Sequence, residues 1–460
     1  MKKVFPSLLI AFLVLLLPLQ AYAATLDQVR SIIEKDYVGE INGNLNSATS
    51  IEDMMNMLDP YSTYFTKEEY EAFIDSIDHT KVGIGIVVEK HEKGILILDV
   101  VKNGSAYKEE LEVGDIITAI NGQETKDMTV EQATSLITGN EGTMVTLTVL
   151  KTNGITKTFS IVRKPFSLET VTSKLLYGNV GYIALNSFST DGASKVKEAY
   201  QSLIGQGATS FILDLQNNGG GYVTTAEDLI GLFPGATNAY KLRTTDGSYI
   251  ASSTHQAVQF PINTRVLINR FSASASEMTA AALLDQKAAI LYGEKSYGKG
   301  SMQSFYEFSD GSYLKLTVGE FFGPKQTVVN HVGVTPNVLT DSNPIYAAHY
   351  DAIVNQVKDY KKMNDLLNVP TTKQFTINFS KQMQVPTQSD AVQLVQLGSN
   401  DSVQVTTTLG SDGKQIIVTP TSPLQQGAQY ILLIHPKMQD TSGTKLKNGY
   451  HLKVTVQTNK

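Results

Sequence analysis

The spacing of apolar residues changes along the chain from a helical to an extended pattern. In residues 26–33 and 50–58, apolar side chains recur three and four positions apart, which is typical of amphipathic helices. From 81 to 164, apolar and polar residues alternate in short runs, and Asn121 and Gly122 mark a hairpin turn. We therefore predict a helical N-terminal segment over 24–80, followed by a compact and mostly extended domain.

The middle of the chain, residues 165–345, shows the strand–helix–strand order of an α/β domain. Residues 180–185 form an apolar run, residues 192–204 have the pattern of an amphipathic helix, and residues 210–215 are almost wholly apolar. A strand of the last kind is expected where both faces of a parallel sheet are covered. This order implies a right-handed crossover and an α/β sandwich.

Beyond this core we predict a helical linker over 346–370 and an all-β sandwich over 371–460. The linker is rich in Lys and Asp, whereas Thr, Gln, Val and Ser dominate from Lys373 onward. Short apolar runs separated by turns are typical of a β-sandwich. They cover residues 375–379, 414–420, 427–434 and 452–456. The fold class predicted for the whole chain is multidomain α+β.

The first 23 residues have the features of a signal peptide. Lys2 and Lys3 precede an apolar run over 8–17, and Ala21 and Ala23 form a small-x-small cleavage site. We therefore expect cleavage after Ala23 and a mature chain that is secreted or held in the cell envelope.

The composition excludes several kinds of chemistry. The chain has no cysteine, so it forms no disulfide and uses no thiol. Its formal net charge of −6 argues against a nucleic-acid partner. The seven histidines are scattered without metal-ligand spacing, so we expect neither a metal nor another cofactor. His331 is the best placed of them near a cleft, and we interpret it as a loop residue.

A strand-to-helix loop carries the residues best suited to catalysis. Ser272, Ser274 and Ser276 alternate with alanines between an apolar run and an Ala/Leu/Met-rich helical pattern. Lys299 follows between two glycines, and Gln303 comes four residues later. A serine hydroxyl needs a base to become a nucleophile, and a lysine can serve when burial lowers its pKa.

Two plainer interpretations stay open at this point. Ser274 and Glu277 have the spacing of a capping box, so Ser274 could simply cap a helix. Lys299 could be a surface lysine beside a turn. If residues 300–308 form a strand, Lys299, Ser301 and Gln303 would lie on one face of it.

The motif Ser-Ala-Ser-Ala-Ser-Glu, followed at this distance by Gly-Lys-Gly-Ser-x-Gln, resembles that of the carboxy-terminal processing (tail-specific) proteases. Residues 214–221 resemble a second motif of that family, a turn that begins with an aspartate. The resemblance to the family as a whole covers roughly residues 26–345. It implies that Ser274 is the nucleophile, Lys299 the general base and Gln303 the residue that orients the lysine.

The same resemblance implies an oxyanion hole formed by the backbone amides of Gly220 and Ala275. Three positions depart from the family pattern: Gln216 replaces an arginine, Gly219 a proline and Phe271 a small residue. None of them is a side chain assigned to the chemistry. We therefore expect an active enzyme with altered detail in its site.

Two further segments resemble binding domains. Residues 81–164 are similar to a PDZ domain, on the pattern Gly-Asp-Ile-Ile-x-x-Ile-Asn-Gly that ends at Gly122. This implies capture of exposed, mostly apolar protein C-termini. The carboxylate would be held by the loop of Gly83, Ile84, Gly85 and Ile86. Residues 371–460 resemble the bacterial Ig-like domains of wall-associated proteins, which implies contact with the cell wall.

These patterns together predict a secreted serine endopeptidase whose protease core spans 165–345. Its substrates would be proteins or peptides with exposed C-termini, and Arg163 and Lys164 at the domain junction would help couple docking to activity. The N-terminal helices could form a homodimer. The alternative is a non-catalytic envelope scaffold or chaperone that binds peptides, although the intact Ser, Lys and Gln set argues against it.

Overall fold

The structure, a computed structural model, describes residues 24–78, 80–102, 104–128, 130–167, 169–340, 343–386 and 390–458. The predicted signal peptide, residues 1–23, lies outside the described residues. The described residues divide into two compact units, the N-terminal unit (within 24–71 and 303–318) and the main unit (within 72–302 and 319–458). In the described ranges, no helix combines the length and apolar character needed to cross a membrane.

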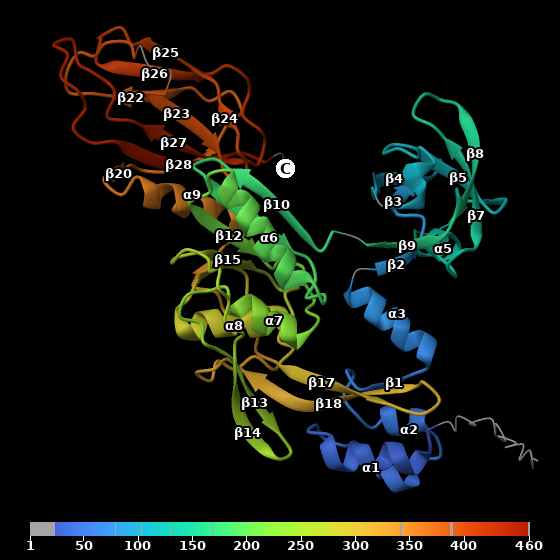
Figure 1. The fold of residues 1–460 in the computed structure, drawn as a ribbon. Helices are drawn as coiled ribbons and strands as arrows, with labels where there is room; N and C mark the ends of the chain where they lie inside the picture. Colours follow the sequence, from blue (N-terminus) through green and yellow to red (C-terminus); the bar gives the residue numbers. More distant parts are fainter. Residues whose placement is uncertain are drawn as a thin grey trace, which may run out of the picture. The chain divides into compact units, whose positions relative to one another are not determined.

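The N-terminal unit is built from short helices around one apolar core, as the helical pattern predicts. Its elements are α1 (Leu26–Asp36), the 3-10 turn η1 (Leu45–Ser47), α2 (Ile51–Met55) and β1 (Thr63–Phe65) (Figure 1). Thr25 and Ser50 close capping boxes on α1 and α2. β1 pairs antiparallel with the start of β18 (Tyr313–Phe322), and Ile33 and Met54 share a buried cluster with Leu314. α3 (Lys67–Ile77) leads onward to the main unit.

Residues 80–167 form a small antiparallel sheet domain with the strand order β3-β4-β5-β7-β8. Its elements are β2 (Thr80–Gly83), β3 (Ile86–His91), β4 (Gly94–Val100), α4 (Ser105–Lys108), β5 (Ile116–Ile120), β6 (Gln123–Glu124), α5 (Val130–Ile137), β7 (Met144–Leu150), β8 (Thr156–Val162) and β9 (Lys164–Ser167). β2 and β9, where the chain enters and leaves, pair with each other. The domain is therefore closed at its base by its own connecting strands.

The core of the main unit is a mostly parallel sheet with the order β10-β11-β12-β15-β16-β19. The strands are β10 (Val171–Leu176), β11 (Val180–Leu185), β12 (Ser210–Asp214), β15 (Arg265–Ile268), β16 (Ile290–Gly293) and β19 (Val338–Leu339). β10 pairs antiparallel with β11, and each following pair is parallel. The crossover from β11 to β12 is α6 (Gly192–Gly205), so the predicted α/β core is confirmed.

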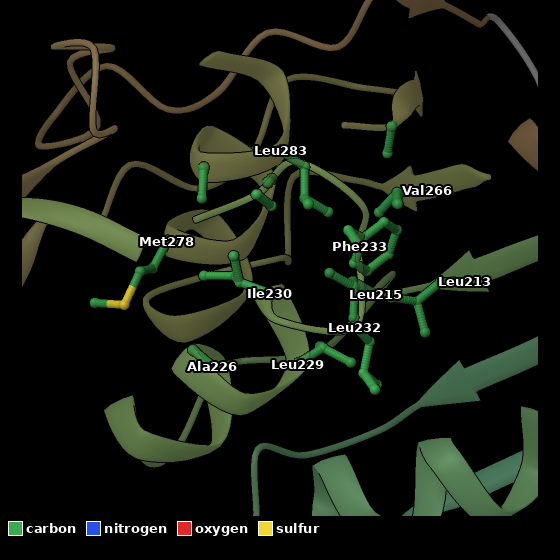
Figure 2. Close-up of a cluster of buried hydrophobic side chains, with 14 of the residues drawn as sticks. Leu213, Leu215, Ala226, Leu229, Ile230, Leu232, Phe233, Val266, Met278 and Leu283 are labelled. Carbon is green, nitrogen blue, oxygen red and sulfur yellow. The ribbon is translucent and has the colours of Figure 1, made fainter. Parts of the chain in front are cut away.

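Helices cover both faces of this sheet. On one face, α6, α7 (Val223–Ile230) and α8 (Ala275–Gln286) share an apolar cluster with Leu213 of β12. On the other face, α9 (Pro344–Gln356) packs with Ile212, the neighbouring residue of the same strand. Figure 2 shows side chains of α7 and α8, among them Leu283, gathered with those of β12 and β15. Because both faces are buried, β12 needs apolar residues in succession, as its sequence has.

A smaller sheet adjoins α8. β13 (Asn238–Thr244) forms a hairpin with β14 (Gly247–Ser252) and pairs on its other side with the end of β18. β14 is the edge strand of this sheet. β17 (Ser301–Glu307) also pairs with β18.

The stretch 346–370 differs from the helical linker that the sequence predicts. α9 ends at Gln356, and its buried residues belong to the core. After it, β20 (Lys361–Lys362) and β21 (Leu366–Val369) pair with β28 (Tyr450–Val456). The sequences of these short strands show no periodic pattern of apolar residues. They become strands by pairing with β28, which lies about 80 residues later in the chain. The prediction of helix was therefore wrong beyond Gln356.

The C-terminal domain is a β-sandwich, as predicted. One sheet has the order β20-β28-β27-β23-β24, and the other has the order β22-β26-β25. The remaining strands are β22 (Phe375–Asn378), β23 (Val392–Gln396), β24 (Ser402–Val403), β25 (Val405–Leu409), β26 (Gln415–Pro420) and β27 (Gln429–Ile434). Phe375 and Tyr430 are fully buried in the cluster that the two sheets share.

Candidate active site

Three neighbouring strands of the core sheet deliver the candidate residues to one edge. β12, β15 and β16 are parallel neighbours, so their carboxyl ends meet at the same edge of the sheet. The loops that follow them carry residues 215–222, 269–274 and 294–300, respectively. The glycine turn, the serine loop and the lysine loop, which are far apart in sequence, therefore converge.

Ser274 differs from the two serines beside it. Ser272 Oγ donates to the Leu215 carbonyl at 2.8 Å and Ser276 Oγ to the Asn218 carbonyl at 2.8 Å, and both serines are fully buried. Ser274 is partly exposed, at the junction of the loop with α8. Its backbone has φ 56° and ψ −113°, a conformation that is strained for a residue with a side chain. A serine on such a strand-to-helix turn presents its hydroxyl outward.

Glu277 joins the serine loop to the lysine loop. Its Oε2 accepts hydrogen bonds from the backbone N–H of Ser274 at 3.0 Å and of Lys299 at 2.8 Å. Its Oε1 accepts from Ser296 Oγ and from the Gly298 N–H, each at 2.6 Å. The side chain is fully buried, and burial raises the pKa of Glu277, although these four hydrogen bonds oppose the rise. One buried carboxyl group thus binds the backbone of both Ser274 and Lys299 and holds their two loops together.

The lysine loop is also held from a second direction. The Ser296 N–H donates to the Val334 carbonyl at 3.1 Å, and the Val334 N–H returns a bond to Ser296 Oγ at 2.6 Å. The His331 N–H donates to the Gly298 carbonyl at 2.8 Å. The exposed His331 thus contributes its main chain to the lysine loop.

Gln303 lies in β17, which begins at Ser301 rather than at residue 300. Lys299 precedes the strand, so the predicted sharing of one strand face applies to Ser301 and Gln303 but not to Lys299. Within the N-terminal unit, Gln303 Nε2 donates to Thr317 Oγ1 of β18 at 3.1 Å. The Gln303 side chain is therefore oriented by a neighbouring strand.

The glycine turn lies directly against the serine loop. A Cβ added to Gly220, which has φ +106°, would stand 2.8 Å from Ser274 Cβ and 3.0 Å from the Ala275 nitrogen. The Gly220 N–H donates to Asn218 Oδ1 at 2.9 Å. The Gly220 N–H, one of the two amides expected to form the oxyanion hole, therefore already has an acceptor within its own turn.

Asn218, fully buried, ties the glycine turn to its neighbours. Its Nδ2 donates to the Leu185 carbonyl at 2.7 Å, and its own carbonyl accepts from the Ala273 N–H at 3.0 Å. Asp214, at the end of β12, accepts a bond from Tyr182 Oη at 2.7 Å, and burial raises the pKa of this carboxyl. These buried polar groups stabilise the conformation of the glycine turn.

Sequence reasoning missed the connecting roles of Glu277 and Asn218. Glu277 was identified by its spacing from Ser274, but as a possible helix cap, and the structure retains its bond to the Ser274 N–H. The signal that the sequence offers is an acidic residue, Glu277, at the start of an Ala/Leu/Met-rich helical pattern. No feature of the sequence shows that Gly298 and Lys299 return to the same carboxyl.

The predicted peptide-binding loop lies at the start of β3. Ile84 is buried in the core of its domain, and the Gly85 carbonyl accepts from the Val101 N–H at 2.9 Å. Gly85, with φ +79°, packs so closely on Gly104 that an added Cβ would stand 2.7 Å from Gly104 Cα. Gly83 ends β2, and Ile86, partly buried, opens β3.

Arg163, at the domain junction, is buried. Its guanidinium donates to the carbonyls of Leu136 and Ile137 at 2.9 Å each, at the C-terminus of α5. It also donates to Thr143 Oγ1 and to the Met144 carbonyl at 2.9 Å. Arg163 thus caps α5, whereas Lys164 is exposed.

No group of three potential metal ligands occurs within the residues that the structure describes. Three of the histidines, His349, His435 and His451, lie instead where α9 and the segment after it meet the C-terminal domain. There they bond to Gly398, Tyr360 and Tyr350, respectively.

Family models of known proteins match three parts of this chain. Residues 179–340 match the family model described as Peptidase family S41, residues 73–150 the PDZ domain and residues 356–456 the Bacterial Ig-like domain. Over 317 residues the chain is 33% identical to "Carboxy-terminal processing protease CtpA" of Bacillus subtilis (strain 168), covering 68% of each protein. The chain belongs to the carboxy-terminal processing proteases of peptidase family S41.

The chain is also similar to a second curated relative and to a solved structure. Over 358 residues the chain is 30% identical to "Probable CtpA-like serine protease" of Staphylococcus aureus (strain MRSA252), covering 77% of this chain and 71% of that one. Among solved structures, the photosystem II D1 C-terminal processing protease has a TM-score of 0.46 and 21% identity, covering 72% of this chain and 95% of that one. The family predicted from the motifs is confirmed, together with its PDZ and Ig-like domains.

Proposed function

We propose that this S41 serine peptidase cleaves proteins with a Ser274–Lys299 dyad supported by Gln303. Ser274 Oγ attacks the scissile carbonyl, and Lys299 Nζ accepts the hydroxyl proton and then donates it to the leaving amine. Water then hydrolyses the acyl-enzyme ester. The observation that carries this proposal is Glu277, because one of its oxygens binds the backbone N–H of both Ser274 and Lys299.

The oxyanion of the tetrahedral intermediate would be stabilised by main-chain amides. Ala275 opens α8 beside Ser274, so its N–H belongs to the first turn, where helix amides lack a partner within the helix. Gly220 is the second candidate, because its Cα lies against Ser274. Its N–H would turn from Asn218 Oδ1 to the oxyanion when substrate binds.

The PDZ domain would capture exposed C-termini of substrates. β3 lies at the edge of its sheet, so a peptide strand can add there through backbone hydrogen bonds. Partly buried apolar side chains of β3 and α5, namely Ile86, Val88 and Leu136, border the domain core and favour an apolar C-terminal residue. The carboxylate would be held at the loop of Gly83 to Ile86.

The proposed setting is outside the cytoplasm. A leader over residues 1–23 would direct export, and the Ig-like domain would provide contact with the cell envelope. The N-terminal helices would provide a homodimer contact. These assignments rest on the sequence pattern and on the domain type.

Cleavage of an unfolded protein such as casein tests the dyad. Residues 24–460 would be compared with Ser274→Ala and Lys299→Ala, with Lys295→Ala, an exposed lysine of the same loop, as the control. We expect both site variants to lose more than about 1,000-fold in kcat/KM, and the control to stay active. The wild-type rate should fall about tenfold per pH unit on the acid side, where the lysine amine is protonated.

The scaffold or chaperone alternative makes a different prediction. If wild type and both variants bind peptides with apolar C-termini but none cleaves protein, with or without those peptides, the catalytic proposal is wrong. If cleavage appears in wild type after such a peptide is added, the enzyme rests in an inactive state and the dyad stands.

A further inference from the structure

Two large aromatic side chains stand in solvent beside the candidate site. Phe271, three residues before Ser274, is 54% exposed, and Tyr297, two residues before Lys299, is 60% exposed. Their loops are joined, because the Tyr297 N–H donates to the Ser272 carbonyl at 3.1 Å. Two large exposed aromatic side chains on joined loops at a candidate site indicate that something binds there.

The loop that carries Phe271 is held by hydrogen bonds. The Phe271 N–H donates to Asn269 Oδ1 at 3.1 Å, and Asn269 Nδ2 donates to Asn217 Oδ1 at 2.9 Å. The Arg270 guanidinium carbon lies 5.1 Å from the centre of the Phe271 ring, close enough for a cation–π contact. The ring is thus exposed and held in position, which reduces the entropy lost when a ligand packs against it.

We infer that Phe271 and Tyr297 form an aromatic wall that selects a large apolar side chain of the substrate next to the scissile bond. This inference rests on the proposed function, which places the scissile carbonyl at Ser274. An extended peptide advances about 3.3 Å per residue, so side chains within two residues of the scissile bond come near the two aromatic residues. Burial against the rings removes apolar surface from water on both partners.

The occupant is a substrate side chain because the wall is continuous with the residues assigned to the reaction. Phe271 shares its loop with Ser274, and Tyr297 shares its loop with Lys299. A third exposed apolar residue, Val332, lies on a segment next to the lysine loop, since its backbone nitrogen is 3.3 Å from a Cβ built on Gly298.

Mapping of cleavage sites by mass spectrometry tests the wall. Casein would be digested with the full mature chain, with Phe271→Ala and with Tyr297→Ala. Tyr249→Ala, which removes a 54% exposed aromatic on the edge strand β14, is the matched control. Wild type and control should cleave next to Leu, Met or Phe at one fixed position. For matched peptides carrying Leu or Ala there, the kcat/KM ratio should fall about tenfold in Phe271→Ala and recover partly in Phe271→Leu.

The outcomes separate this inference from the proposed function. Cleavage by wild type with no residue preference, or with a preference that survives in Phe271→Ala and Tyr297→Ala, overturns the wall while leaving the protease intact. Absence of cleavage by wild type, both with and without an added peptide that has an apolar C-terminus, overturns the proposed function itself. A dimer in light scattering that Phe271→Ala converts to a monomer, with unchanged preference, would assign the patch to self-association and also overturn the inference.

Discussion

At the scale of single residues, Glu277 decides how the site is held together. Its two oxygens accept four hydrogen bonds, and two of them come from the backbone of Ser274 and Lys299. In Glu277→Gln, an amide NH2 would replace one carboxylate oxygen and face at least one backbone N–H donor, so at least one of the four bonds would be lost. We expect kcat/KM to fall about 100-fold, because a displacement near 1 Å at reacting groups has that effect.

If Glu277 only stabilised the fold, Glu277→Gln would lower the stability of the protein without changing kcat or the pH dependence of the rate. We expect the loss to appear in kcat rather than in KM, with the acid limb of the pH–rate profile shifted because Lys299 is repositioned. Glu294→Gln, an exposed acid in the same loop, is the control. Wild-type kcat and pH profile in Glu277→Gln would show that the carboxyl has no positioning role.

The residues of the site could be predicted to very different degrees. Ser274 and Lys299 stand in motifs whose spacing is visible along the chain, and the strands before them are marked by continuous apolar runs. Glu277 and Asn218 act through contacts between loops that are distant in sequence, such as Asn218 with Leu185. Periodicity describes how one element is buried, and it does not show which loop ends will share a hydrogen bond.

At the scale of elements, the agreement between sequence and structure follows element length. β11 is marked by an apolar run of six residues and α6 by a helical period over fourteen, and both appear within a residue of the predicted bounds. β20 and β21 were missed, because Lys361–Lys362 and Leu366–Val369 become strands only by pairing with β28. Tertiary pairing, rather than local preference, orders such short polar segments.

The cap of α5 gives a prediction at this scale. In Arg163→Met, the carbonyls of Leu136 and Ile137 and the Met144 carbonyl lose a charged donor, and the end of α5 should fray. Since hydrogen bonds to charged groups contribute roughly 1.5–3 kcal/mol, we expect the PDZ domain to be clearly destabilised. Because α5 borders the proposed peptide groove, the Kd for a peptide with an apolar C-terminus should rise about tenfold.

Titration calorimetry on residues 24–460 carrying Ser274→Ala measures this effect without turnover. Lys164→Met is the matched control, because Lys164 is the next residue and is exposed. Equal Kd values for the Arg163 and Lys164 variants would show that the cap of α5 has no effect on peptide binding.

At the scale of the whole molecule, the Ig-like domain is packed on the protease core. Ile353 of α9 lies in one buried cluster with Val395 and Ile431 of the Ig-like sheet. His349, fully buried, completes the joint: its Nδ1 accepts from the Gly398 N–H at 2.9 Å, and its Nε2 lies 2.9 Å from the Tyr177 carbonyl. This pairing requires a neutral ring with the proton on Nε2.

The joint should therefore weaken in acid. Burial lowers the pKa of His349 from 6.5 to about 4, and Lys174 and Arg265 act in the same direction. Burial also lowers the pKa values of His435 and His451. Between pH 6.5 and 4 the unfolded chain binds protons that the folded chain refuses, so the free energy of unfolding falls as the pH falls, by up to roughly 3 kcal/mol for His349.

Thermal unfolding between pH 7.5 and 4 tests this linkage. In His349→Gln, the side-chain amide can accept from Gly398 and donate to Tyr177 without titrating. We therefore expect a lower Tm at pH 7.5 but a shallower decline toward pH 4 than in wild type. His255→Gln, at an exposed histidine, should keep the wild-type slope. A slope in His349→Gln as steep as that of wild type would place the acid sensitivity elsewhere in the chain, because the only change between the two proteins is the loss of this titrating ring.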